Sequence, residues 1–174
     1  MNLIPKLYQY KTLLFLMEKL LENLKEAEKT INTIDHILYV TFPIVNDKKI
    51  LLKSLIELKI AVIKIINSIL QYEYLFKRTN IYKDPKDNFR NFENNCSIRY
   101  NIDKLEINLI KELFDLVERH KKSSMEFIKD EKIIILGENM NHKTITLEKV
   151  KKFLNLSKNL LKKTKIIMKS DFSL

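Results

Sequence analysis

The chain is nearly free of glycine. Its 174 residues include one glycine, three prolines, one cysteine and no tryptophan. An average domain has about 7% glycine, which would be roughly twelve residues here. Glycine-rich phosphate loops, dinucleotide-binding fingerprints and hairpin-rich sandwiches need residues that accept a positive φ or a close backbone approach. We therefore expect none of these, and no cofactor.

Cysteine and long apolar runs are also scarce. Cys96 has no second cysteine to pair with, which is typical of a reducing cytoplasm. Lys59 and Lys64 interrupt the most apolar stretch, so no run of 18 apolar residues is present to span a membrane. The run 13–17 is too short for the core of a signal peptide. The sequence thus predicts a cytoplasmic protein with no transmembrane segment.

Positive charge is abundant. The formal net charge is +10, from 32 Lys and Arg against 22 Asp and Glu, and all but four of the basic residues are lysine. This balance is typical of proteins that bind nucleic acid or anionic membranes. Drift in an AT-rich genome, which favours Lys, Ile and Asn codons, is the alternative explanation. Residues 143–174 carry nine lysines and two acids, a concentration that uniform drift explains less well.

Two segments have apolar residues at heptad spacing, which predicts two long helices. The first seam alternates steps of three and four residues and consists of Tyr10, Leu13, Met17, Leu20, Leu24, Ala27, Ile31, Ile34 and Leu38. The second has the same alternation and consists of Leu51, Leu55, Leu58, Val62, Ile65, Ile69, Tyr72 and Phe76. We expect the first helix to end at Pro43 and Asn46 to cap the second. Seams of this kind pack within one chain or form a homodimer interface.

A third long helix is expected in the second half of the chain, with Asn101 as its N-cap. Its inward residues are expected to be Ile102, Leu105, Leu109, Leu113 and Leu116. Ser123 and Glu126 have capping-box spacing, which predicts one further helical turn. Residues 132–136 and 143–146 read as a β-hairpin with Gly137 at a positive φ in its turn, and Thr146 caps the last helix.

These elements predict one domain over residues 1–174. Residues 1–122 would hold three long helices, with a short helical connection at 84–96. Residues 123–146 would form the turn and hairpin, and 147–168 a basic helix. Because short connections favour antiparallel neighbours, the expected fold is all-α: an antiparallel up-down bundle of four main helices with a small β-hairpin before the last helix.

Three groups of residues are candidate sites. The ends of the first and third helices would bring Asp35 and His36 near His120, a set that could perform acid–base chemistry, although no pair has metal-ligand spacing and we expect no metal. At the opposite pole, Arg78 and Arg99 would lie near Glu73 and several tyrosines, either as a structural ion pair or as an anion site. The third group is a stripe on the last helix at alternating steps of four and three, consisting of Lys151, Asn155, Lys158, Lys162, Lys165 and Lys169. Such a stripe can follow a phosphate backbone or remain a solvated face.

Several stretches together resemble a family of small, uncharacterised helical proteins from DPANN-type archaea. They are "DHILYVTFPIVNDKKILL" (35–52), "ILQYEYLFKR" (69–78), "NNCSIRYNI" (94–102), "HKKSSMEFIKDEKIIIL" (120–136) and "HKTIT" (142–146). The resemblance covers roughly residues 5–165 and implies an archaeal source and a helical fold. No activity is known for that family, so it implies no substrate.

The sequence therefore favours a non-enzymatic binding module that contacts RNA or DNA through its basic C-terminal helix. Two alternatives remain open. One is a protein–protein interaction module or homo-oligomer that uses the long seams. The other is an enzyme that uses Asp35, His36 and His120.

Overall fold

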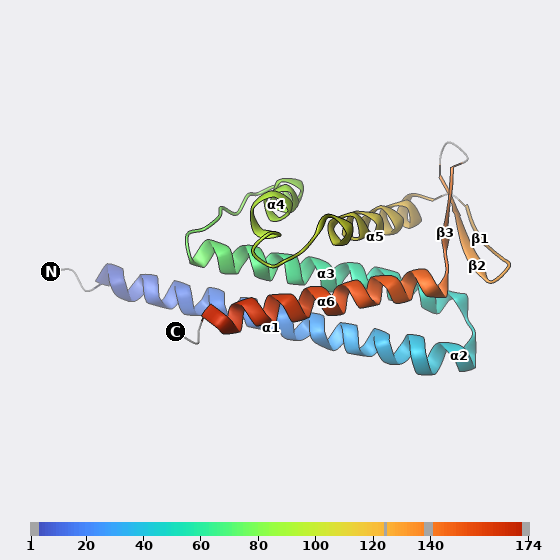
Figure 1. The fold of residues 1–174 in the computed structure, drawn as a ribbon, viewed down its shortest axis with the longest axis horizontal. Helices are drawn as coiled ribbons and strands as arrows, with labels where there is room; N and C mark the ends of the chain where they lie inside the picture. Colours follow the sequence, from blue (N-terminus) through green and yellow to red (C-terminus); the bar gives the residue numbers. More distant parts are fainter. Residues whose placement is uncertain (1–3, 124, 138–140, 172–174) are drawn as a thin grey trace.

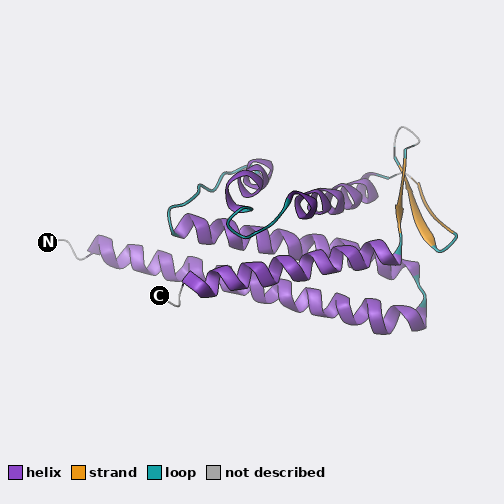
Figure 2. Cartoon of the chain, viewed as in Figure 1, coloured by secondary structure: helices purple, strands orange, loops and turns teal. Residues whose placement is uncertain are grey.

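The structure is a computed structural model, and it describes the backbone of residues 4–123, 125–137 and 141–171, with side chains from residue 14 onward. Over these residues the protein is mostly helical, with a small antiparallel sheet before the last helix (Figures 1 and 2). In chain order the elements are α1 (Ile4–His36), a π-helical turn (Ile37–Thr41), α2 (Phe42–Val45), α3 (Lys48–Leu75), α4 (Pro85–Asn91), a second π-helical turn (Phe92–Cys96), α5 (Lys104–Lys122), β1 (Met125–Lys129), β2 (Lys132–Leu136), β3 (His142–Ile145) and α6 (Leu147–Asp171). The expected helical class with strands before the last helix is confirmed.

Helix α3 is the centre of the packing. It contacts α1, α5 and α6, and its seam is buried from Leu51 to Tyr72. The seam of α1 and of the π-helical turn that follows it is buried from Leu20 to Leu38, so the two heptad patterns are used inside the chain. Helix α6 lies along both α1 and α3, and the sheet lies beside the start of α6 (Figure 1). Burial of these apolar stripes is the main favourable term in the fold.

The sequence predicts that the first helical segment ends at Pro43, and this prediction is wrong. The segment continues through the π-helical turn to Val45, and Pro43 lies in the first turn of α2. Proline lacks an N–H and its ring clashes with the carbonyl four residues earlier. The π-helical turn, in which the Phe42 N–H donates to the Ile37 carbonyl, widens the helix immediately before the proline.

The N-cap predicted for α3 is wrong by one residue, whereas the N-cap predicted for α6 is confirmed. Asp47, not Asn46, caps α3, and its carboxylate accepts from the Lys49 N–H at 2.9 Å. Asn46 instead takes a left-handed conformation (φ 50°) that closes the preceding helical turn. The expected N-cap at Thr146 is confirmed, because its hydroxyl accepts from the Lys149 N–H at 3.2 Å.

The start of α5 shows the same displacement. Asp103 caps the helix and forms a reciprocal capping box with Glu106, whereas Asn101 is left-handed (φ 53°) in the turn before it. This start places Leu105 outward, at 73% exposure, which contradicts its predicted inward position. The buried face consists of Ile107, Ile110, Leu113, Leu116 and Val117.

The sheet has three strands instead of the expected two. Strands β2 and β3 pair antiparallel as predicted, but β1 pairs with β2 where a further helical turn was expected after Ser123. Ser124 and residues 138–140, which include most of the predicted hairpin turn, lie outside the described residues. Gly137 does not have the predicted positive φ. A Cβ at this position would lie 3.3 Å from the Asn141 carbonyl oxygen, so close backbone approach explains the glycine.

The β1–β2 turn is attached to the start of α3. Asp130 and Glu131 both have positive φ (47° and 64°), the geometry of a tight hairpin turn that is usually made by Asn-Gly. Left-handed backbone at a non-glycine residue costs about 1–2 kcal/mol. The Glu131 carboxylate pairs with the ammonium of Lys48, a lysine with only 8% exposure that also donates to Asn46. This contact holds the turn in place.

Among the described residues, no helix combines the length and the apolarity needed to cross a membrane.

The cap assignment of α5 predicts different effects for two substitutions. Asp103→Ala removes the capping box and is expected to lower the free energy of unfolding by about 1 kcal/mol. Asn101→Gly is expected to leave it unchanged or raise it, because glycine accepts a positive φ without steric cost. Urea unfolding monitored by circular dichroism measures both. A loss of stability in Asn101→Gly with none in Asp103→Ala would contradict the assignment.

Candidate functional site

The lysines of α6 divide into two groups, and the first group binds the chain's own acids. On the side that faces α1, Lys158 pairs with Asp35 at 2.7 Å and Lys165 with Glu28 at 2.6 Å. The ammonium of Lys151 lies 4.3 Å from the centre of the Tyr39 ring. These three members of the predicted stripe are half-buried and therefore take part in helix packing.

On its other side, α6 is paired with α5. Lys149 pairs with Glu112 at 2.6 Å, and Lys163 with Glu106 at the same distance. Lys163 also donates to the Asn101 carbonyl at 2.7 Å, so it ties α6 to the turn that precedes α5. Ion pairs at a protein surface are each worth about 0–1 kcal/mol, and the main effect of these partly exposed pairs is to neutralise charge.

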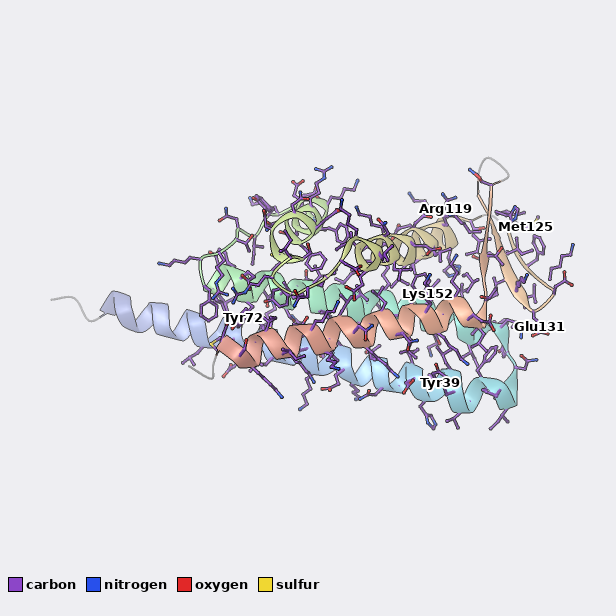
Figure 3. All side chains as sticks on the ribbon, in the orientation of Figure 1. Tyr39, Tyr72, Arg119, Met125, Glu131 and Lys152 are labelled. Carbon is purple, nitrogen blue, oxygen red and sulfur yellow. The ribbon has the colours of Figure 1, made fainter. Side chains whose placement is uncertain are left out.

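The second group of lysines lies on the outward face of α6. In the view of Figure 3, Lys152 lies on α6, between helices α1 and α5. The residues that share this exposed face are Lys152, Asn155, Asn159, Lys162, Ile166 and Lys169. Residues 149–170 contain no acid. The outward face is therefore a positive strip. It shares Asn155, Lys162 and Lys169 with the stripe predicted from the sequence, but it includes Lys152, and the other three predicted members turn toward α1.

The arginine pole contains a compact cluster of opposite charges. Arg78 and Arg99 both approach the carboxylate of Glu73, at 3.5 and 3.3 Å, as the structural interpretation of this pole predicted. Both also approach Oδ2 of Asp171 at the end of α6, at 3.3 and 2.7 Å. Two arginines and two carboxylates give the cluster no net formal charge.

Two tyrosine hydroxyls complete the cluster. Tyr100 donates to Glu73 at 2.9 Å, and both side chains are buried. Tyr72 donates to Asp171 at 3.0 Å, and Figure 3 shows it near the C-terminal end of α6. The cluster thus joins α3, the connection before α5, and α6 through charge-assisted hydrogen bonds. Asp171 was not predicted, because it lies 99 residues from Tyr72 in sequence.

Burial and ion pairing shift the pKa values of this cluster. Burial, together with the hydrogen bond to Asp171, raises the pKa of Tyr72 to about 12. Burial and the Glu73 carboxylate also raise the pKa of Tyr100. For Asp171, burial alone would raise the pKa, but hydrogen bonds from Tyr72, Arg99 and Arg78 hold it below the usual value. Asp171 is therefore ionised and both hydroxyls are protonated at neutral pH.

Cys96 lies beside this cluster and is an unreactive thiol. It is buried, and burial followed by the nearby Glu73 charge raises its pKa to about 11. A nucleophilic cysteine needs a lowered pKa and access to solvent. Its role is to fill the core beneath the 84–96 connection.

The structure gives each member of the predicted Asp/His pole a different environment. Asp35 pairs with Lys158, and His120 Nδ1 lies 2.6 Å from the Glu126 carboxylate on β1. His36 lies on a shallow groove of α1. In the view of Figure 3, Tyr39, three residues after His36, and Arg119, next to His120, lie on opposite sides of α6. No described contact joins Asp35 or His36 to His120.

Within the described part of the chain, no group of three His, Cys, Asp or Glu side chains is arranged to hold a metal ion. The groove beside His36 has a volume of about 650 Å³. Another, of about 560 Å³, lies between α1 and α3, and a larger one, of about 980 Å³, lies between α3, α4 and α5. The larger has an apolar floor that includes Phe89 and Phe114, with the pairs Lys59–Glu118 and Lys111–Glu93 beside it.

Comparison of the chain with protein-family models, with curated proteins and with solved structures gives no match.

The Tyr72 environment predicts how stability changes at high pH. A tyrosine whose pKa is higher in the folded than in the unfolded protein stabilises the fold fully below pH about 10, and this contribution is lost as pH rises toward about 12. Tyr72→Phe should lower stability at pH 9, because Asp171 loses a hydrogen bond. Between pH 10 and 12 its free energy of unfolding should fall less steeply than that of the wild type, by about 1 kcal/mol per pH unit.

Urea unfolding at several pH values measures both slopes. Equal slopes for the two proteins would show that Tyr72 ionises alike in the folded and unfolded states, contrary to the hydrogen-bonded geometry.

Proposed function

We propose that this protein is a non-enzymatic binding module that contacts a nucleic-acid backbone through the outward face of α6. The observation that supports this proposal is the eight lysines and no acid between residues 149 and 170, with Lys152 and Lys162 directed away from the acids of α1 and α5. Phosphate backbones attract such a strip without needing a shaped pocket. The exposed Asn155 and Asn159 add hydrogen-bond donors between the two charges.

The dimensions of this face suit a backbone contact. Lys152 and Lys162 are ten residues apart, which corresponds to about 15 Å along a helix. One strand of B-DNA rises about 3.4 Å per nucleotide, so the two ammonium groups would span four to five nucleotides. Lys158 and Lys165 are half-exposed and could exchange their carboxylate partners for phosphates. Binding of this type is expected to be weak and insensitive to base sequence.

In this proposal the rest of the molecule is a scaffold. We take α1, α3, α5 and α6 as the four helices of an up-down bundle. Arg78 and Arg99 hold the C-terminal turn of α6 in place by binding Asp171, so they would support the lysine face rather than contact the nucleic acid directly.

Neutralising the outward lysines tests this function. Wild-type protein should bind a fluorescein-labelled single-stranded RNA or duplex DNA at low salt, and log K should fall linearly as log salt rises. Lys152→Gln/Lys162→Gln should reduce the salt slope by about 1–2, which corresponds to two lost phosphate contacts. Fluorescence anisotropy at several salt concentrations measures the slope.

Lys149→Gln is the matched control, because this lysine is on the same helix but pairs with Glu112. It should leave the slope close to that of the wild type. No binding at low salt, or binding that does not weaken with salt, would exclude the electrostatic contact.

A second function, self-association, is favoured by the start of α1. This part of the helix projects beyond the ends of α3 and α6 (Figure 1). On α1 near this end, three described apolar side chains are strongly exposed, with Leu14 at 60%, Phe15 at 63% and Leu21 at 59%. Leu14 and Leu21 are one heptad apart and lie on one face, which is the spacing of a helix–helix contact.

Sedimentation equilibrium tests this second function. The wild type should show a concentration-dependent dimer that Leu14→Gln/Leu21→Gln shifts to monomer. The control is Ile98→Gln, which removes a similarly exposed side chain (79%) from a different surface. A wild type that stays monomeric throughout the concentration series would remove self-association through α1.

A further inference from the structure

The groove between α1 and α3 has the features of a small-ligand site. Its volume of about 560 Å³ is within the range of ligand pockets. Its apolar lining includes Ile34, Ile37 and Ile50. Ile37 and Thr41, the first and last residues of the π-helical turn, both line it. Single π-helical turns often occur at functional sites, where they change the spacing of side chains along a helix.

The residues that line the groove include Ser54, whose hydroxyl is buried beneath it and has no hydrogen-bond partner among the described residues. Ser54 has 1% exposure. Three other buried hydroxyls in these helices are satisfied by the carbonyl four residues earlier. They are Ser68 (to Lys64, 2.9 Å), Ser157 (to Phe153, 2.9 Å) and Thr164 (to Leu160, 2.7 Å). Ser54 does not use that partner, and an unsatisfied buried donor is costly.

The charges of the groove favour a monoanion. Three lysines and two glutamates line it, which leaves one net positive charge. Lys64 and Glu26 pair with each other across α1 and α3. Lys29 on α1 and Lys53 on α3 are exposed members of the lining, and no ion pair is described for either of them. One carboxylate beside them would balance the remaining charge.

We propose that this groove binds a small amphipathic monocarboxylate. Its carboxylate accepts a hydrogen bond from the Ser54 hydroxyl and lies near the ammonium groups of Lys29 and Lys53. Its apolar body lies on the isoleucine floor. The site is separate from the outward lysine face of α6, so either proposal can fail without the other.

Titration of ¹⁵N-labelled wild-type protein with octanoate tests the site. Saturable chemical-shift changes are expected for amides of residues 26–41 and 50–57. Octylamine, which has the same chain and the opposite charge, should not produce them. Changes that never saturate, that lie outside these segments, or that octylamine reproduces would exclude the proposed site.

Two serine variants distinguish an effect on octanoate affinity from an effect on the stability of the free protein. Ser54→Ala should weaken octanoate binding about tenfold or more, because it removes a hydrogen bond to a charged group. Without ligand the same variant should raise Tm by about 2–4 °C, since it also removes an unsatisfied buried hydroxyl. Ser68→Ala is the matched control two heptads along α3: it should leave octanoate affinity unchanged and should not raise Tm.

If Ser54→Ala binds octanoate as tightly as the wild type, the hydroxyl has no role in binding and the proposal is wrong. The same conclusion follows if Ser54→Ala lowers Tm, because the hydroxyl would then be satisfied within the free protein by a structural water.

Discussion

The apolar seam of α3 is the constraint on which the other elements depend. This helix is buried along its length, and α1, α5 and α6 all pack against it. Because three helices pack on α3 through their apolar faces, their polar side chains must find hydrogen-bond and ion-pair partners at the edges where neighbouring helices meet. The ion pairs between α6 and its neighbours lie at these edges, and they fix which lysines turn inward and which turn outward.

The distribution of charge follows from that packing. The excess of lysine is concentrated on the last helix, yet its inner members meet Asp35, Glu28, Glu112 and Glu106. At the end of α6, Asp171 stands at a helix C-terminus, where a negative charge is unfavourable, and two arginines compensate it. The surplus that remains is on the outward face. In the folded protein, the excess positive charge of the last helix is therefore concentrated on one narrow surface.

Much of the fold could be predicted from short-range pattern. Heptad spacing predicted α1 and α3, and Thr146 was correctly identified as a cap, because these signals lie within a few neighbouring residues. Where two capping residues stood close together, as at Asn101 and Asp103, the sequence did not show which would be left-handed. Strand β1 was missed since its five residues gain stability only by pairing with β2.

The candidate sites were less predictable, for a physical reason. The sequence placed Arg78 and Arg99 beside Glu73, but Asp171 joins them only through tertiary packing. Likewise, helical periodicity placed a lysine stripe on α6, while its exact phase depends on where α1 and α5 lie. The unsatisfied Ser54 hydroxyl has no sequence signal, because Ser68 on the same helix has the same residue type and is satisfied.

Lysine footprinting tests the division of the α6 lysines most directly. An amine-acetylating reagent would be applied to the native protein with and without a nucleic-acid oligonucleotide at low salt, and each site read by mass spectrometry. Lys152 and Lys162 should be modified rapidly in the free protein and protected by the oligonucleotide, whereas Lys149 and Lys163 should be slow in both states. Protection confined to other surfaces, with Lys152 and Lys162 unchanged, would contradict the assignment of the outward face of α6 as the contact surface.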